Sequence, residues 1–300
     1  MPEIIEVKSY VDFIKKCTSN HKLLKIKILK GRYKTHEPFA HFKLLKRKLP
    51  IKIESINTKG KFTYFKIDDL YLGVSLGLFG GWLFKKNNSE KFNYPDFYDT
   101  FDPEIASNYL DRALNHLNIE FVFENGSLFY YDQLSFGSFT VFTSQELLDK
   151  KLKQLGLDIM DPETTLEMFT DKLMKTTNLK KPIGLVLLNQ KIIAGVGNYL
   201  RADLLWLCKI SPFRKVSDLT NLDLKKLYKN IRLLTWASYD YKLGVKLKVI
   251  DKDDKLPIDY KNEFLVYSRD KDIYGNEITK EKLYDGKFVR HIFWVPKLQK

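Results

Sequence analysis

The helical half of this sequence is centred on the stretch Leu187-Leu188-Asn189-Gln190-Lys191-Ile192-Ile193-Ala194-Gly195-Val196-Gly197-Asn198-Tyr199. Its second part, Gly195 to Asn198, leads into a segment with helical spacing. Backbone N–H groups at a helix N-terminus bind phosphate, so the stretch predicts a phosphate site. A Gly-x-Gly is also common at an ordinary corner between two helices, and alone it does not separate these interpretations. Around it, residues 144–245 are predicted to be mostly helical, with helices beginning at Ser144 and spanning 164–174 and 219–239.

The chain begins with Met1-Pro2-Glu3, and apolar residues then recur at helical spacing up to Lys16. Methionine before proline is normally removed in cells, which would leave Pro2 with a free secondary amine. An α-amino group has a pKa of about 8, and the dipole of the following helix lowers it, so this amine is a candidate nucleophile that can form an imine. Glu3 lies beside it and is a candidate for proton transfer. Many unrelated chains begin with these three residues, so this interpretation depends on motifs further along the chain.

Residues 23–143 alternate between apolar and polar positions with a period of two. The clearest strand-like runs are 24–29, 51–56, 62–67 and 119–123. Several such strands at short spacing predict an antiparallel sandwich or barrel. Residues 85–110, which include Asn87-Asn88-Ser89 and Tyr94-Pro95, are predicted to be a loop.

Three turns in this region carry candidate functional residues. Lys59-Gly60-Lys61 lies between two predicted strands and presents Lys61, which could equally be an ordinary solvated lysine. The glycine-rich stretch 76–82 places Leu78 and Phe79 at a tip, either as an exposed wedge or as a packed strand end. Asp132-Gln133-Leu134-Ser135-Phe136-Gly137 is another turn with apolar residues at its tip. Apolar tips in a basic protein suit insertion into a stack of bases.

The chain is strongly basic. Its 300 residues carry a formal net charge of +14 and a pI of about 9.4, which is typical of proteins that bind nucleic acid. The two cysteines, Cys17 and Cys208, argue against a disulfide-stapled secreted protein and exclude a four-cysteine zinc site. Because no run of 18 apolar residues and no signal-peptide pattern follows Met1, we expect a soluble intracellular protein, nuclear or cytoplasmic, without membrane contact.

The C-terminal part begins with a charged, turn-rich stretch, 244–257, which is predicted to be a linker or mobile loop. Residues 263–267 and 290–296 are predicted to form the two strands of a terminal hairpin.

Together these motifs resemble the formamidopyrimidine-DNA glycosylase/endonuclease VIII family. The resemblance rests on their order along the chain: Met1-Pro2-Glu3, Gly60-Lys61, 76–80, 187–198 and a late arginine hairpin. Runs 74–80 and 133–136 look most like the endonuclease VIII-like 2 branch, which includes giant-virus members. The resemblance implies an α+β multidomain fold with DNA in the cleft between domains. These are an N-terminal antiparallel β-sandwich with an N-terminal helix (1–145), a helix-two-turn-helix domain (146–245), and a linker with a β-hairpin finger (246–300).

The resemblance also implies catalytic roles. Pro2 matches the nucleophile that attacks the sugar C1′, and Glu3 matches the proton-transfer residue. Lys61 matches a lysine that contacts the DNA backbone near the lesion.

Further matches imply DNA contacts. The amides of Gly195 and Gly197, together with Asn198, match a phosphate clamp, and Arg290 matches a finger arginine that grips the phosphates flanking the flipped nucleotide. Leu78 matches the residue that fills the gap left when the base swings out, and Phe136 would supply apolar contact.

The chain also departs from the family pattern. Where many members have Asp-x-Arg-Arg-Phe-Gly, it has Leu134 and Ser135, so one phosphate contact and one strand-intercalating arginine are missing. Asn189 and Asp203 replace the usual Asp and Glu of the helical motif.

The finger is expected to lack zinc. The positions of the zinc ligands are occupied by Asp272, Asn276, Val295 and Leu298. A structural zinc contributes about 10–16 kcal/mol to a small finger. Burial of four apolar side chains, at about 1.5–3 kcal/mol each, could replace much of this free energy. These side chains are Phe288, Ile292, Phe293 and Trp294.

We therefore expect a monomeric, bifunctional DNA glycosylase and AP lyase of base excision repair that needs no cofactor. Pro2 would form a Schiff base with the sugar, followed by β- and then δ-elimination. The expected partner is damaged DNA, single-stranded, bubble or duplex, with oxidised pyrimidines and abasic sites as substrates. A non-catalytic damaged-DNA-binding protein of the same fold is the main alternative. A ribosomal or topoisomerase-like helix-two-turn-helix binder would not explain the N-terminal motif.

Overall fold

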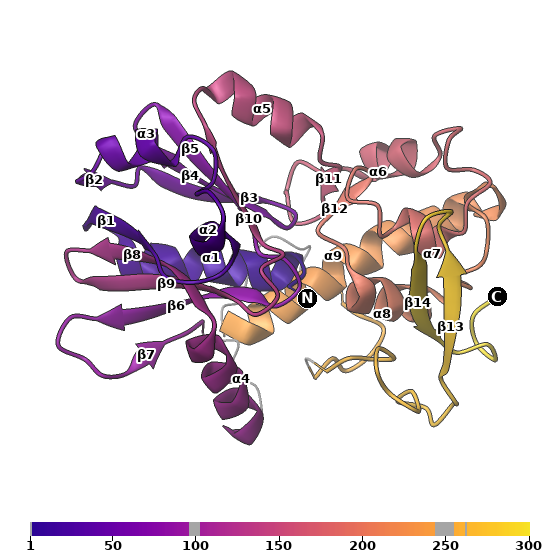
Figure 1. Ribbon diagram of the computed structural model, residues 1–300. Helices are drawn as coiled ribbons and strands as arrows, with labels where there is room; N and C mark the ends of the chain where they lie inside the picture. Colours follow the sequence, from indigo (N-terminus) through magenta and orange to yellow (C-terminus); the bar gives the residue numbers. More distant parts are fainter. Residues whose placement is uncertain (1, 96–102, 244–254, 262) are drawn as a thin grey trace. The chain divides into compact units, whose positions relative to one another are not determined.

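The computed structural model describes residues 2–95, 103–243, 255–261 and 263–300 (Figure 1). The chain divides into two units, Met1–Gln154 and Leu155–Lys300. The three-part division into 1–145, 146–245 and 246–300 stays a prediction.

The first unit contains two antiparallel sheets. The larger has the strand order β2-β1-β8-β9-β6-β7, and the smaller has the order β10-β5-β4-β3. The predicted antiparallel sandwich is confirmed. The strands are β1 (Lys22–Ile28), β2 (Ile51–Lys52), β3 (Ser55–Lys59), β4 (Phe62–Ile67), β5 (Leu70–Ser75), β6 (Gly80–Lys86), β7 (Phe92–Asn93), β8 (Leu117–Phe123), β9 (Gly126–Asp132) and β10 (Ser138–Phe142). The helices are α1 (Ile4–Thr18), α2 (Arg32–Thr35), α3 (Phe42–Arg47), α4 (Pro103–Asn115) and α5 (Gln145–Lys153).

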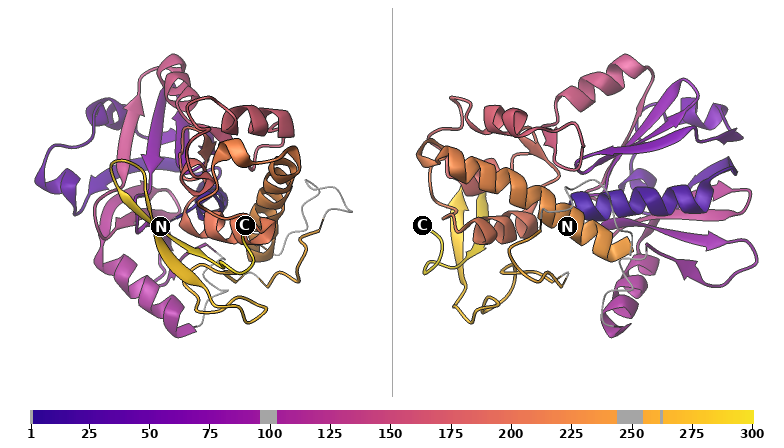
Figure 2. Two further views of the ribbon diagram at one scale, coloured as in Figure 1. Left: turned by 90° about the vertical axis from the view of Figure 1, so that its right-hand side faces the viewer. Right: turned by 180° about the vertical axis from the view of Figure 1, so that it is seen from behind.

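An aromatic core holds the sandwich together. Trp82, on β6, is 1% exposed, and its indole lies 5.3–6.1 Å from four other rings. These rings belong to Phe65, Phe121, Tyr130 and Phe139. The helix α1 was predicted from its apolar spacing and is confirmed. It packs on both sheets, contacting β3 and β4 of one and β6 of the other (Figure 2).

Two predictions for this unit were wrong. Residues 51–56 do not form one strand, because β2 pairs with β1 in the larger sheet whereas β3 pairs with β4 in the smaller. The predicted loop at 85–110 contains β7 and most of α4, although residues 96–102 lie outside the described part. The helix α4 contains many polar residues, and its few apolar ones decide its structure. Ala113 is buried beside Leu83 and Tyr131, and such tertiary packing supplies most of the stability of a short helix.

Helices make up most of residues 144–243, as predicted for this part of the chain, and the second unit continues beyond them to a C-terminal hairpin. Its elements are β11 (Leu157–Asp158), α6 (Leu166–Leu173), α7 (Ile183–Val186), β12 (Ile193–Ala194), α8 (Asn198–Cys208), a 3-10 helix η2 (Val216–Asp218), α9 (Asn221–Leu243), β13 (Thr279–Tyr284) and β14 (Val289–Trp294). The predicted helices are confirmed. The side chain of Ser144 caps α5 and that of Thr165 caps α6, each by accepting an N–H from the first turn.

The terminal hairpin exists, but its first strand was predicted in the wrong place. The partner of β14 is β13, with Leu283 opposite Arg290. Residues 263–267 form no strand, because the backbone amides of Leu265, Val266 and Tyr267 donate to the carboxylate of Asp203 instead. Of the predicted linker 244–257, residues 244–254 lie outside the described part of the chain.

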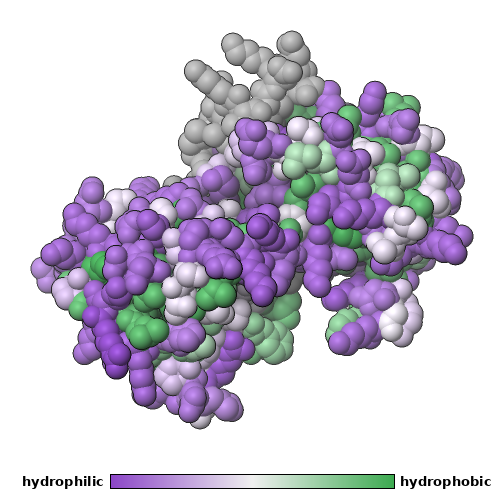
Figure 3. Space-filling model, turned by 90° about the horizontal axis from the view of Figure 1, so that it is seen from above, coloured by the Kyte–Doolittle hydropathy of each residue, from purple (hydrophilic) through white to green (hydrophobic). Residues whose placement is uncertain are grey.

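Hydrophilic residues dominate the face shown in Figure 3, with hydrophobic ones scattered among them. In the described ranges, no helix is long and apolar enough to cross a membrane.

Candidate active site and nucleic-acid contacts

The N-terminus of α1 is fixed by two glutamates. Glu3 precedes the helix and is 1% exposed, while Glu6 is the third helical residue. The Glu6 carboxylate accepts the Glu3 N–H at 2.9 Å, and the Glu3 carboxylate accepts the Glu6 N–H, forming a capping box. Pro2, which is half-buried, directly precedes this box. The local structure therefore holds Pro2 and two carboxylates together.

Lys61 completes this group of side chains. It follows Gly60, whose φ of 57° closes the tight turn between β3 and β4. Lys61 is half-buried rather than a fully solvated turn lysine. Burial lowers the pKa of its ammonium from the ordinary value of 10.5, and the charges of Glu3 and Glu6 oppose this shift. The structure thus brings Lys61 within electrostatic range of both carboxylates. Glu6 was missed in the sequence, although its position three residues after Glu3 is the spacing of a capping box.

The two turns with apolar tips, which carry Leu78 and Phe136, are neighbours in the structure. Gly77 has a φ of +73°, and a Cβ there would lie 2.6 Å from the Gly137 nitrogen. The turn containing Leu78 and Phe79 therefore touches the turn containing Phe136. Phe79 is 48% exposed and Phe136 is 63% exposed, so the interpretation of the first tip as a packed strand end was wrong.

A buried carboxylate shapes the second tip. Asp132 accepts the Gly137 N–H at 2.6 Å through Oδ2 and the Leu134 N–H at 3.2 Å through Oδ1. The Tyr130 hydroxyl donates to the same Oδ2 at 3.0 Å. Three hydrogen bonds to one carboxylate fix the turn, so Phe136 projects from a rigid support.

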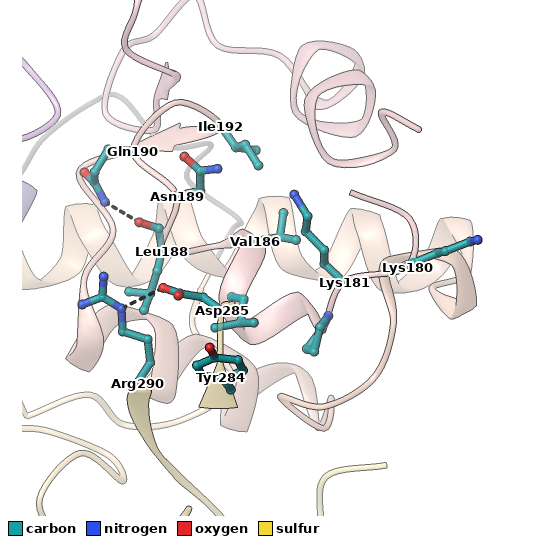
Figure 4. Close-up of a pocket in the computed structure, with 12 residues that line it drawn as sticks. Lys180, Lys181, Val186, Leu188, Asn189, Gln190, Ile192, Tyr284, Asp285 and Arg290 are labelled. Atoms are coloured by element: carbon teal, nitrogen blue, oxygen red, sulfur yellow. Dashed lines mark hydrogen bonds and ion pairs between the residues drawn. The ribbon is translucent and has the colours of Figure 1, made fainter. Parts of the chain in front are cut away.

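The turn before α8 is held by the carboxamide of Gln190. Its Oε1 accepts the Gly195 N–H at 2.9 Å, and its Nε2 donates to the Val196 carbonyl at 2.7 Å. Figure 4 labels Gln190, whose Nε2 also donates to the Leu188 carbonyl at 3.0 Å. Gly195, with a φ of +103°, makes the turn possible. Because the Gly195 amide is engaged inside the protein, it does not also bind a phosphate in this conformation, and the roles of Gly197 and Asn198 in the clamp stay predictions.

Asn198 is oriented by a buried arginine that sequence reasoning missed. Arg201 lies one turn further along α8 and is 0% exposed. Its Nη2 donates to Asn198 Oδ1 at 3.3 Å and to the His291 carbonyl at 2.5 Å, and its Nη1 donates to the Gly184 carbonyl at 3.0 Å. Because Asn198 accepts through its oxygen, its amino group is left as a donor for an anion. The signal in the sequence was an arginine three residues after Asn198 on a helix whose other residues are mostly apolar.

Arg290 lies at the edge of a pocket of about 520 Å³ (Figure 4). Residues between Lys180 and Ile192 line one wall, and Tyr284, Asp285 and Arg290 of the hairpin line the other. Lys180, Lys181 and Arg290 make this pocket basic. The Arg290 Nε lies 3.3 Å from Asp285 Oδ2.

Residues 1–139 match the formamidopyrimidine-DNA glycosylase N-terminal domain, and residues 155–239 match the formamidopyrimidine-DNA glycosylase H2TH domain. The formamidopyrimidine-DNA glycosylase of Ureaplasma parvum is 31% identical over 250 residues, which cover 79% of this chain and 78% of the relative. The chain belongs to the formamidopyrimidine-DNA glycosylase family. The family resemblance is thereby confirmed, while its placement in the endonuclease VIII-like 2 branch stays a prediction.

Other members of the formamidopyrimidine-DNA glycosylase family extend this similarity. The enzyme of that name from Oceanobacillus iheyensis is 29% identical over 235 residues, covering 77% of this chain and 74% of the relative. A complex of Lactococcus lactis Fpg with abasic-site DNA has the same fold, with a TM-score of 0.74 at 24% identity over 99% of both chains. The complex of wild-type Lactococcus lactis Fpg with DNA containing an oxidised pyrimidine matches over 100% of both chains, with a TM-score of 0.74 at 25% identity.

In this family member, buried side chains attach the finger to α8 and to the residues that directly follow it. The Asp203 carboxylate accepts the amides of residues 265–267 at 3.0–3.2 Å. The Trp206 indole N–H donates to Asp272 Oδ2 at 3.0 Å, and the Gln299 amide group donates to the Ile210 carbonyl at 2.9 Å.

One part of the packing argument for the finger was wrong. Ile292 is buried and Phe293 and Trp294 are half-buried, but Phe288 is 51% exposed. Phe288 lies at the hairpin turn, where the cationic groups of Lys287 and Arg290 cover its ring. Phe288 therefore contributes little to the stability of the finger. Hydrogen bonds that join the finger to Asp203 and Trp206 of α8 stabilise it instead.

The positions expected for zinc ligands are used in other ways. Asp272 Oδ1 accepts the Tyr274 and Asn276 amides at 2.9 and 2.8 Å, while the Val295 carbonyl accepts the Leu298 amide. Among the residues that the structure describes, no group of three or more His, Cys, Asp or Glu side chains is placed to hold a metal ion. The expectation of a finger without zinc stays a prediction.

Proposed function

We propose that this chain is a bifunctional DNA glycosylase and AP lyase of base excision repair. It removes oxidised bases, pyrimidines in particular, and cleaves the DNA strand at the resulting abasic site. The observation that carries the proposal is the group formed by Glu3, Glu6 and the half-buried Lys61 beside Pro2. The chain belongs to a family of DNA glycosylases, which supports a role for these side chains in a reaction on damaged DNA.

The proposed reaction begins with the secondary amine of Pro2. As its nitrogen bonds to C1′, the bond from C1′ to the base breaks and the base leaves with the electron pair. Opening of the sugar ring then gives a cationic imine, which acidifies the neighbouring C–H bond for β- and then δ-elimination. Glu3 transfers the protons that these steps require. Glu6 fixes the geometry of Glu3 through the capping box, and Lys61 contacts the backbone phosphate near the lesion.

Other residues of the chain would hold the DNA. The amino group of Asn198 and the backbone at Gly197 bind one phosphate at the N-terminus of α8, and Arg290 binds another. Leu78 fills the space left by the flipped base, and the rigid tip carrying Phe136 contacts the adjacent bases. Two observations support this assignment: both tips are exposed, and Lactococcus lactis Fpg of similar structure has been solved with DNA containing an oxidised pyrimidine.

Borohydride trapping tests the proposal. Borohydride reduces an imine to a stable amine, so incubation with abasic-site DNA should yield a covalent protein–DNA adduct that maps to Pro2 by mass spectrometry. A protein that retains Met1 should give no adduct, because the Pro2 nitrogen is then an amide.

Lys61 is the competing nucleophile, since lysines also form Schiff bases. Lys61→Ala should lower the rate of cleavage yet still allow trapping at Pro2. Lys66→Ala, at the far end of β4, is the matched control and should change neither. Trapping that survives a blocked terminus and is lost in Lys61→Ala would assign the chemistry to Lys61. DNA binding without any trapping or cleavage would favour the non-catalytic damage-binding protein.

A further inference from the structure

The turn of the hairpin is built around the carboxylate of Asp285. Its Oδ1 accepts the backbone N–H groups of Lys287 at 2.9 Å and Phe288 at 2.6 Å. The Asp285 N–H donates to the Phe288 carbonyl at 3.1 Å, which closes the turn beyond the last pair of the ladder. One oxygen of this side chain therefore determines the backbone conformation between β13 and β14.

The other oxygen acts on Arg290. Oδ2 accepts from Arg290 Nε at 3.3 Å, as the dashed line in Figure 4 shows, and the guanidinium carbon lies 5.3 Å from the centre of the Phe288 ring. The Arg290 side chain is 47% exposed and that of Asp285 is 28% exposed. Because the carboxylate engages Nε, the two Nη groups are left as a fork that matches two oxygens of a phosphate.

The carboxylate is ionised at neutral pH. The Phe288 and Lys287 amides lower the pKa of Asp285 below its ordinary value of 3.8, and the bond from Arg290 lowers it further. A negative charge at this place would, by charge alone, weaken the binding of DNA. Its presence beside an arginine that faces a basic pocket therefore needs an explanation other than charge.

We propose that Asp285 is a positioning residue that holds the Arg290 guanidinium ready to receive a backbone phosphate of damaged DNA. This inference rests on the proposed function. A free arginine side chain loses rotamer freedom when it binds, which weakens affinity by about two- to tenfold. Asp285 and the Phe288 ring already restrict the rotamers of the Arg290 side chain in the protein without DNA. The gain from preorganisation exceeds the loss from the added negative charge.

Asp285→Asn separates the two actions of this side chain. The asparagine keeps an oxygen for the turn amides, but it presents an NH₂ donor to Arg290 Nε in place of an acceptor. The dissociation constant for duplex DNA with an uncleavable tetrahydrofuran site is measured by fluorescence anisotropy, together with the single-turnover rate on abasic DNA. We expect binding about two- to tenfold weaker with an unchanged melting temperature. The rate at saturating protein should be nearly unchanged.

Two comparisons make the result specific. Glu277→Gln removes one negative charge from an exposed side chain of the same finger and should not weaken binding. In an Arg290→Ala background, Asp285→Asn should have no further weakening effect, because its action passes through Arg290. The inference is overturned if Asp285→Asn binds DNA as tightly as the unmodified protein, or more tightly. It is also overturned if Asp285→Asn weakens binding by the same factor with and without Arg290→Ala.

Failure of this inference can be told from failure of the proposed function. If the unmodified protein neither binds nor cleaves abasic DNA, both are overturned. If it does both and Asp285→Asn still binds as tightly, only the positioning role is wrong.

Discussion

Replacement of Asp203 by asparagine should change how the stability of the second unit depends on pH. The Asp203 side chain is buried and accepts three backbone amides from residues 265–267. Those amides favour the charged form, but burial outweighs them and raises the pKa of Asp203 from 3.8 to about 6. The folded protein therefore binds a proton at this site more tightly than the unfolded chain does.

The difference between the pKa of Asp203 in the folded protein and in the unfolded chain determines the sign and size of its contribution to stability. Between pH 3.8 and 6 the folded state holds more protons than the unfolded state, so the free energy of unfolding falls as pH rises. The contribution is fully present below pH 3.8 and is lost once pH has passed 6. A difference of 6 − 3.8 = 2.2 units corresponds to about 3 kcal/mol, at about 1.4 kcal/mol per unit.

Urea unfolding at pH 4 to 7.5, followed by tryptophan fluorescence, measures this contribution. Three of the four tryptophans, Trp206, Trp236 and Trp294, lie in the second unit, so the signal reports chiefly on that unit. The stability of the unmodified protein minus that of Asp203→Asn should fall by about 2 kcal/mol across this range, because part of the contribution is already lost at pH 4. Other carboxylates titrate in both proteins and cancel in the difference. A difference that stays constant, or that rises with pH, would refute the reasoning about burial.

Three further predictions concern metal, salt and strand context. Elemental analysis should find no stoichiometric zinc; one zinc per chain, with activity lost to a chelator, would contradict this. Arg290→Ala should weaken binding and cleavage of abasic DNA together and lower the slope of log affinity against log salt by about 0.9 on duplex, since one phosphate contact is lost; unchanged cleavage would mean that this arginine is misplaced. Excision of one oxidised pyrimidine should be at least as efficient in single-stranded or bubble DNA as in duplex, because Leu134 and Ser135 replace the arginine pair; a strong duplex preference would argue against that.

Local patterns were enough to predict several elements and turns. Apolar spacing predicted α1, the hydroxyl of Ser144 predicted the start of α5, and the alternating runs on either side of Gly60 predicted the turn that carries Lys61. In each case the deciding interaction lies within a few residues. The identity of the family likewise rested on short motifs in a fixed order.

Long-range pairing could not be predicted in this way. The strand β13 has only one buried residue, Leu283, and its alternation is too weak to compete with the apolar run at 263–267. The backbone amides of that run donate to the carboxylate of Asp203 instead of to a neighbouring strand, and Asp203 lies about 60 residues earlier in the sequence. The role of Arg201 toward His291 depends on a contact across 90 residues, which no local pattern reveals.

The hydrogen bonds of Arg201 have a consequence for engineering. One guanidinium joins Asn198, at the start of α8, to the backbone of β14 beside Arg290. The hairpin therefore cannot be exchanged independently of α8 without affecting this hydrogen-bond network. In a finger transplanted from a relative, a shift of the corresponding backbone carbonyl would break this hydrogen bond, and the Arg201 guanidinium that orients the Asn198 carboxamide would lose one of its fixed partners. Chimaeras in which α8 and the hairpin are exchanged together should retain DNA affinity that chimaeras of the hairpin alone lose.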